Sequence, residues 1–163
     1  MWFRKAKRPT PEAVVRNLRE MALTVEASEI NVAPSPGHDV VWGLLVDIAF
    51  PEAVATLVCL ADGTTSLYFS NGRGVIGAGE HASVRDAAER FIALANSYVG
   101  AFTISTDSAM PSTGRVRFHV RTFEGLRTAE ADEQALGQGQ HELSPLFHAG
   151  HEVITAIRES GAM

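Results

Sequence analysis

The sequence predicts an α+β domain in which helices flank an antiparallel sheet of five strands, in the order α-βββ-α-ββ-α. Three observations lead to this fold class. Residues 40–70 contain three β-rich runs joined by short turn sequences, the pattern of an antiparallel meander. Amphipathic or well-capped helical segments precede the meander, follow it and end the chain. The length of 163 residues is that of one ordinary domain.

The composition narrows the class of protein. Hydrophobic residues make up 45% and charged residues 20%, as in globular chains, and the net charge of −5 argues against a specific nucleic-acid partner. There is no run of about 18 apolar residues, so no membrane span is expected. The single cysteine, Cys59, lies in an apolar run and predicts a buried thiol, which suits a reducing, cytoplasmic location.

The N-terminal residues differ from the rest of the chain. Residues 1–9 predict a flexible basic arm, and residues 10–163 predict the single domain. The arm combines aromatic residues with four cations, so contact with an anionic membrane surface is an alternative to a loosely docked end. The cations are Arg4, Lys5, Lys7 and Arg8.

The first helix is expected to begin at Thr10 as N-cap, with Pro11 at the first helical position, and to run to about residue 27. An apolar stripe and a polar side indicate that this helix packs on another element. The stripe holds Val14, Leu18, Met21 and Val25, and the polar side holds Arg16, Arg19, Glu20 and Glu26.

Residues 40–50, 53–61 and 64–70 predict the three strands of the meander. Both faces of the first strand are largely apolar, which predicts a central strand. One face is expected to hold Val40, Trp42, Leu44, Val46, Ile48 and Phe50. Asp62 and Gly63 lie between the second and third strands, where a type I′ turn is expected.

The second half of the chain predicts two further strands and two helices. A capping box formed by Ser83 and Asp86 starts a helix over residues 84–98. Strands are expected over 101–106 and 115–123, then a polar connection with one helical turn near 129–136. Ser144 as N-cap and Pro145 at the first position begin the last helix, which runs to about residue 160.

The stretch SNGRGVIGAGEH, residues 70–81, contains the Gly-x-Gly-x-x-Gly spacing of a dinucleotide-binding loop. That loop requires a parallel strand before it, whereas the strand here belongs to an antiparallel hairpin. The glycines are therefore interpreted as shaping a connection, and no cofactor is expected. One alternative remains open, a small anion bound at the start of the following helix. Its contacts would be Arg73, Gly74, Gly77, His81 and Ser83.

Polar residues alternate with apolar ones in the strand over 115–123. Alternate side chains stand about 7 Å apart on one face of a strand, so this row could bind a polyanion or an acidic partner. The simpler interpretation, which we prefer, is that these residues face water and pair with acids on a neighbouring strand. A contact with the acidic residues 130–133 of a second copy is a further alternative. This candidate interaction face consists of Arg115, Arg117, His119 and Arg121.

Asp47 interrupts an apolar strand, and Asp47 with His119 is the first pair to expect at a pocket, since an unpaired buried acid is costly. His148 and His151 are spaced to share one face of the last helix. They match no zinc-binding order, so no metal site is expected. The serines lie in no nucleophile motif, and no catalytic residue is identified.

The hairpin that feeds a glycine-bearing loop and a helix, residues 55–79, resembles the small profilin-like α/β domains, and roadblock-type domains are the nearest of these. The resemblance concerns the order of elements over residues 11–160, and many bacterial proteins are similar in this general build. It implies an antiparallel five-stranded sheet, flanking helices, frequent homodimers and non-catalytic scaffolding roles. A third strand before the middle helix departs from the roadblock order, so dimer mode and partners do not carry over.

These observations favour a non-catalytic cytoplasmic interaction or scaffold module, a homodimer that contacts itself or another protein through a sheet edge or a helix face. The alternative is a small anionic-ligand binding protein or an enzyme with a pocket at residues 72–81.

Overall fold

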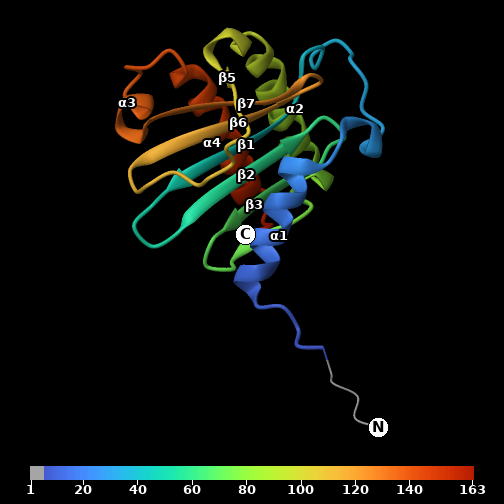
Figure 1. Cartoon of the computed structure of the whole chain (residues 1–163), viewed down its shortest axis with the longest axis vertical. Coiled ribbons are helices and arrows are strands. Elements are labelled where there is room, and N and C mark those ends of the chain that lie inside the picture. Colours follow the sequence, from blue (N-terminus) through green and yellow to red (C-terminus); the bar gives the residue numbers. More distant parts are fainter. Residues whose placement is uncertain (1–5) are drawn as a thin grey trace.

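The computed structural model describes residues 6–163 and is α+β. A single sheet has the strand order β4-β3-β2-β1-β6-β7-β5, and every neighbouring pair is antiparallel (Figure 1). The strands are β1 (Val41–Ala49), β2 (Val54–Leu60), β3 (Thr65–Phe69), β4 (Gly74–Val75), β5 (Thr103–Ile104), β6 (Arg115–Thr122) and β7 (Gly125–Asp132).

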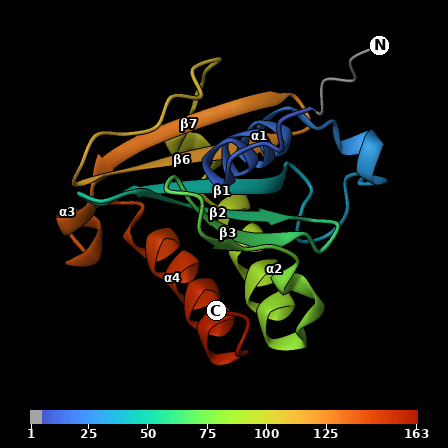
Figure 2. The same ribbon diagram turned by 90° about the horizontal axis from the view of Figure 1, so that it is seen from below.

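Helices cover both faces of this sheet. The α-helices are α1 (Pro11–Thr24), α2 (Ala82–Asn96), α3 (Glu133–Gly137) and α4 (Ser144–Glu159), and short 3-10 turns are η1 (Ala27–Ile30), η2 (Ala78–Glu80) and η3 (Val99–Ala101). Figure 2 shows α1 alone on one face and α2 with α4 on the other. Two apolar clusters follow from this layering: a large one beneath α2 and α4, and a smaller one beneath α1.

The predicted meander over residues 40–70 is confirmed by the pairing of β1 with β2 and of β2 with β3. The turn at Asp62 differs from the type I′ expectation, because only Gly63 has a positive φ. The Asp62 carboxylate instead accepts a hydrogen bond from the amide of Thr64 at 2.9 Å. This side chain-to-backbone turn needs one left-handed residue rather than two.

The sheet has seven strands and not the predicted five, and its order of elements differs accordingly. The main addition is β7, where a polar connection with a helical turn was expected. Its alanines and acids have low strand propensity, but β6 pairs with it along its full length, from Thr122 opposite Gly125 to Arg115 opposite Asp132. Pairing with a buried neighbour therefore overrides local preference, and α3 begins only at Glu133.

Three local predictions also need correction. The capping box at Ser83 is wrong, because η2 leads directly into α2 and makes His81 the N-cap, without a side-chain hydrogen bond. The strand expected over 101–106 is reduced to the two residues of β5. The last helix begins one residue early, with Leu143 as N-cap.

A bulge in β1 moves Trp42 to the face opposite the one predicted. The register with β6 shifts between Val41 and Gly43, so Trp42 packs in the cluster beneath α1 while Leu44 packs beneath α2 and α4. An extra residue on one strand reverses the alternation on either side of it. Gly43 lies at this shift, where a Cβ would meet the Leu60 side chain.

The start of α1, the cysteine and the N-terminal arm were also subjects of prediction. Thr10 caps α1 as predicted, accepting a hydrogen bond from the amide of Ala13 at 3.1 Å. Cys59 is fully buried, and burial raises the pKa of its thiol. Within residues 6–163, none of the helices has the length and apolar character needed to cross a membrane. Of the predicted basic arm, residues 1–5 lie outside the described part, and residues 6–10 are exposed without regular structure.

Candidate functional site

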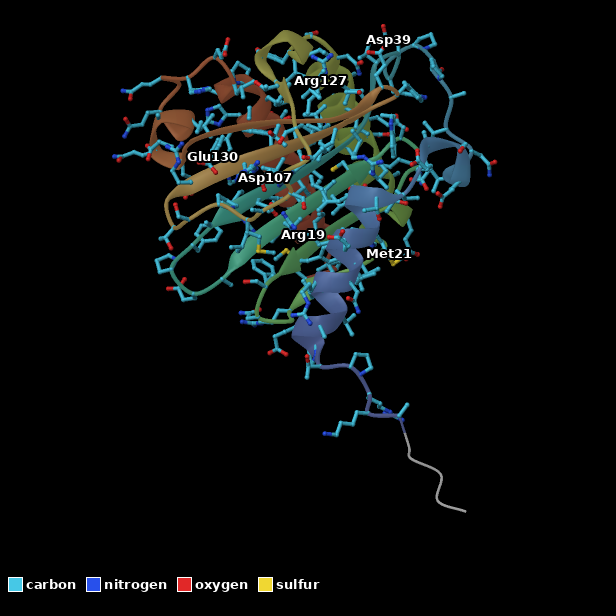
Figure 3. The ribbon with its side chains drawn as sticks, viewed as in Figure 1. Arg19, Met21, Asp39, Asp107, Arg127 and Glu130 are labelled. Carbon is cyan, nitrogen blue, oxygen red and sulfur yellow. The ribbon has the colours of Figure 1, made fainter. Side chains whose placement is uncertain are left out.

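A buried ion pair attaches α1 to the sheet. Nη2 of Arg19 on α1 donates to Oδ2 of Asp47 on β1 at 2.6 Å, and Nε donates to Oδ1 at 3.3 Å. Asp47 is fully buried and Arg19 is 7% exposed. Nη2 also donates to the carbonyl of Ser108 at 2.7 Å, and Figure 3 shows Arg19 on the side of α1 that faces the loop carrying Asp107.

Asp47 is the centre of this polar cluster. Its carboxylate also accepts hydrogen bonds from Thr56 Oγ1 at 2.6 Å and from His119, whose Nε2 lies 2.8 Å from Oδ2. A carboxylate can only accept, so Nε2 of His119 carries the shared proton. Burial raises the pKa of Asp47, but the hydrogen bonds with His119 and Arg19 and the charge of Arg19 outweigh burial and hold that pKa below its usual value.

A second arginine fixes the other end of α1. Arg121 on β6 donates to the carbonyls of Ala22 at 2.6 Å and Val25 at 2.5 Å. These carbonyls belong to the last turn of the helix, where backbone acceptors lack partners within the helix. The guanidinium also lies 4.5 Å from the centre of the Trp42 ring. Arg19 and Arg121 therefore determine where α1 lies on the sheet.

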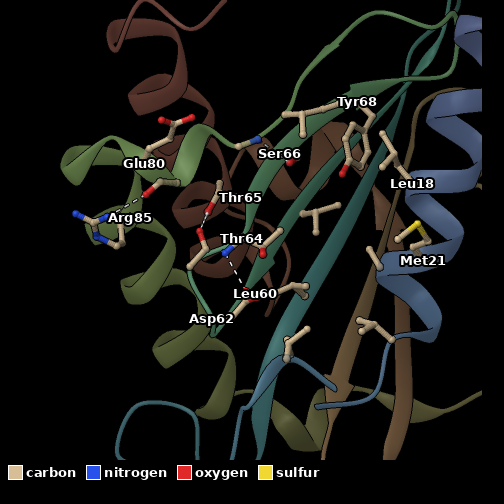
Figure 4. Close-up of a pocket in the computed structure, with 18 residues that line it drawn as sticks. Leu18, Met21, Leu60, Asp62, Thr64, Thr65, Ser66, Tyr68, Glu80 and Arg85 are labelled. Carbon is tan, nitrogen blue, oxygen red and sulfur yellow. Dashed lines mark hydrogen bonds between the residues drawn. The ribbon is translucent and has the colours of Figure 1, made fainter. Parts of the chain in front are cut away.

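With α1 in this position, a groove of about 580 Å³ opens between the helix, the β2–β3 hairpin and the glycine loop. Figure 4 shows Leu18 and Met21 on its helix side and Glu80 and Arg85 on its far side. The apolar lining consists of Leu18, Met21, Ala22, Val25, Ile30, Val58, Leu60, Tyr68 and Ile76. The volume and apolar lining are those of protein binding pockets.

The groove continues along α1 toward the start of the helix. A smaller hollow of about 260 Å³ shares Leu18, Tyr68 and Ile76 with it and ends at Pro9 and Pro11. Three large apolar side chains along the two hollows are exposed: Val14 by 37%, Met21 by 64% and Ile76 by 65%. Apolar surface gathered in this way marks a binding site more often than scattered exposed residues do.

The glycine loop forms part of the groove and lies in a different setting from a dinucleotide-binding loop. β3 and β4 are antiparallel, so the parallel setting that a dinucleotide loop needs does not exist. Gly72 and Gly77 have positive φ. Gly74 approaches the backbone of β3 at Leu67, and a Cβ on Gly79 would collide with the carbonyl of Gly63. The glycines thus provide turns and close backbone contacts.

The structure distributes the predicted anion contacts over three places. Gly77 lines the groove, and Gly74 lines both its continuation along α1 and another hollow beside the C-terminal residues Ala162 and Met163. Arg73 lines only the hollow beside Ala162 and Met163. His81 and Ser83 are exposed at the start of α2. The groove itself holds Asp62, Glu80 and Arg85, and Arg85 donates to the carbonyl of Gly79 at 3.2 Å. Its charged end is therefore predominantly acidic.

The row of basic residues on β6 makes contacts within the chain. Arg115 pairs with Glu130 on β7 at 3.2 Å, and Arg117 lies 3.3 Å from Asp107. His119 and Arg121 are buried beneath α1. Among residues 6–163, no group of three or more His, Cys, Asp or Glu is placed to hold a metal ion. His151 packs edge-on against Phe147, with ring centres 4.5 Å apart.

Sequence reasoning identified the Asp47–His119 contact, but neither residue lines the hollows along α1, where a pocket would have given the pair a role. It missed Arg19, which it assigned to the polar side of the first helix. Arg19 follows Val15 by four residues and precedes Ala22 by three, so it lies on the same buried stripe. Arg19 is the one cation on that stripe, and Asp47 is the one acid in an apolar strand. This match of two isolated opposite charges was the signal that could have predicted their pairing.

We expect Asp47→Ala to lower the free energy of unfolding by about 3–5 kcal/mol, because it leaves the Arg19 guanidinium buried without its partner. Urea unfolding followed by circular dichroism measures the loss. Asp39→Ala is the matched control, since Asp39 is exposed, and a surface change of this kind stays within about 0.5 kcal/mol. Equal effects of the two variants would contradict this account of α1.

The lowered pKa of Asp47 also predicts a pH dependence. A carboxyl whose pKa is lower in the folded state stabilises the fold above its unfolded pKa of about 4 and loses that contribution as the pH falls. The difference in unfolding free energy between the native chain and Asp47→Asn should be largest near neutral pH and shrink below about pH 4. A difference that stays constant on acidification would be inconsistent with a lowered pKa.

Gly79→Ala should destabilise the fold by about 1–3 kcal/mol, the usual effect of forcing an atom into a packed contact. The contact is the carbonyl of Gly63 at the hairpin. Gly100→Ala is the control, because a Cβ there meets open space. Thermal unfolding compares the two variants, and a Gly79→Ala melting temperature matching that of Gly100→Ala would show that the loops are not in contact.

A comparison of the chain with protein-family models found no match, and searches of curated proteins and of solved structures also returned none. The groove and the residues that form it are therefore the features from which a function can be inferred.

Proposed function

We propose that this protein is a non-catalytic interaction module that binds an extended polypeptide segment in the groove along α1. The observation that carries the proposal is the gathering of Val14, Met21 and Ile76, three exposed apolar side chains, along the two adjoining hollows. Apolar anchors at the centre of a surface patch dominate binding between proteins.

The shape of the hollow supports a chain as its ligand. The two adjoining hollows follow α1 from Pro11 to Val25, and fourteen residues of helix extend about 21 Å. An extended segment of about six residues has this length. A polypeptide can place alternate side chains along such a surface, as peptide-binding grooves do.

The charges support a segment that carries cations. The carboxylates of Asp62 and Glu80 line the hairpin end of the groove and outnumber its one cation, Arg85, which donates to the Gly79 carbonyl. The protein as a whole carries a net charge of −5. A basic ligand is therefore attracted and an anionic one repelled.

The test is selection of binders from a random peptide library displayed on phage, followed by fluorescence anisotropy of the selected peptides. We expect enrichment of segments with aromatic or aliphatic residues next to Lys or Arg. Met21→Arg and Ile76→Arg should each weaken binding by about tenfold or more, because they place a like charge in the apolar contact.

Ile104→Arg is the matched control, because Ile104 is 76% exposed but lies on β5 at the opposite edge of the sheet. Binding should be unchanged in this variant. Failure to select any binder, or equal loss of binding in the Ile104 and Ile76 variants, would overturn the proposed function.

A further inference from the structure

We propose that the segment bound in the groove is the N-terminal arm of a second copy of this chain, so that two copies exchange residues 1–8 reciprocally. The inference rests on the proposed function, since it names the partner of the same groove.

The sequence of the arm has the chemistry that the groove selects. Trp2 and Phe3 are large aromatic residues, and four cations follow them within five positions: Arg4, Lys5, Lys7 and Arg8. Both lysines of the protein lie in this segment. The groove offers apolar side chains along α1 and the carboxylates of Asp62 and Glu80 at its end. Aromatic anchors and opposite charges thus match on the two surfaces.

The two prolines next to α1 direct the arm away from its own groove. Arg8 and Thr10 each precede a proline, and such residues are restricted to extended conformations. Thr10 has φ −66° and ψ 156° accordingly. In Figure 1 the described residues before α1 continue beyond the start of the helix, away from the hairpin end.

The reach of the arm then excludes binding of Trp2 and Phe3 beside Met21 of the same chain. Four extended residues carry Lys7 about 13 Å beyond Pro11, and Met21 lies about 15 Å along the helix in the other direction, so the return path is about 28 Å. Residues 2–7 span at most about 18 Å. A second copy has no such restriction, and its arm can enter the groove from outside.

The position of the arm also suggests the symmetry of the pair. Pro9 and Pro11 line the smaller hollow that continues the groove, so each arm leaves its chain where a groove begins. Two chains related by a twofold axis near these prolines can each place an arm in the groove of the other, which closes the assembly as a dimer.

The test combines sedimentation velocity with site-specific crosslinking of the 163-residue chain. The native chain should dimerise as its concentration rises from low micromolar to hundreds of micromolar. The double variant Trp2→Ala with Phe3→Ala should remain monomeric, as should Met21→Arg, while Ile104→Arg should dimerise like the native chain. These arm positions precede the domain, and unfolding curves verify that each variant folds.

Mixing separates exchange between chains from binding within one chain. One chain carries benzoylphenylalanine in place of Phe3 together with Met21→Arg, so its own groove is impaired. We expect it to crosslink to the groove of the Trp2→Ala, Phe3→Ala chain, and mass spectrometry should place the link on α1 or beside Ile76. Raised salt should reduce the yield, because the arm is basic and the hairpin end acidic.

A crosslink to α1 within one chain, a crosslink outside the groove, or a native chain that stays monomeric throughout would each overturn the inference. If library peptides still bind the groove in that case, the proposed function stands and only the identity of its ligand changes.

Discussion

The ion pair between Arg19 and Asp47 fixes the geometry on which the groove depends. Asp47 is fully buried, and each of its oxygens accepts hydrogen bonds from neighbouring side chains. A buried ion pair adds little net stability over an apolar pair, but its loss is costly, so it disfavours every position of α1 that separates the two charges. Arg121 makes the opposite connection: it lies on the sheet and donates hydrogen bonds to carbonyls at the end of α1. The groove therefore lies beside a helix whose position on the sheet is held at both ends by these contacts.

Much of the fold follows from local sequence, and the exceptions have physical causes. The meander of β1, β2 and β3 was predictable because alternation and turn residues specify it locally. β7 was not, since its strand conformation comes from pairing with β6 along its length. Trp42 was assigned to the wrong face because a bulge depends on how β1 registers with β6, and that register is a property of two strands.

Of the features around α1, only the buried polar pair beneath the helix was predictable from the sequence. An acid in an apolar strand and a histidine in a neighbouring one indicated the pair of Asp47 and His119, which lie 2.8 Å apart. The groove depends on Met21, Ile76 and the hairpin at Asp62, which are brought together by the docking of a helix. Each of these residues alone resembles ordinary surface, so only the assembled chain shows the site.

The sheet ends at both margins in strands of two residues, β4 and β5. Strands this short cover only part of their neighbours: β5 pairs with Arg127 and Thr128 of the eight-residue β7, and β4 pairs with Leu67 and Tyr68 of β3. Side chains, such as those that line the groove, can discriminate between ligands far better than the repetitive backbone of a sheet edge can.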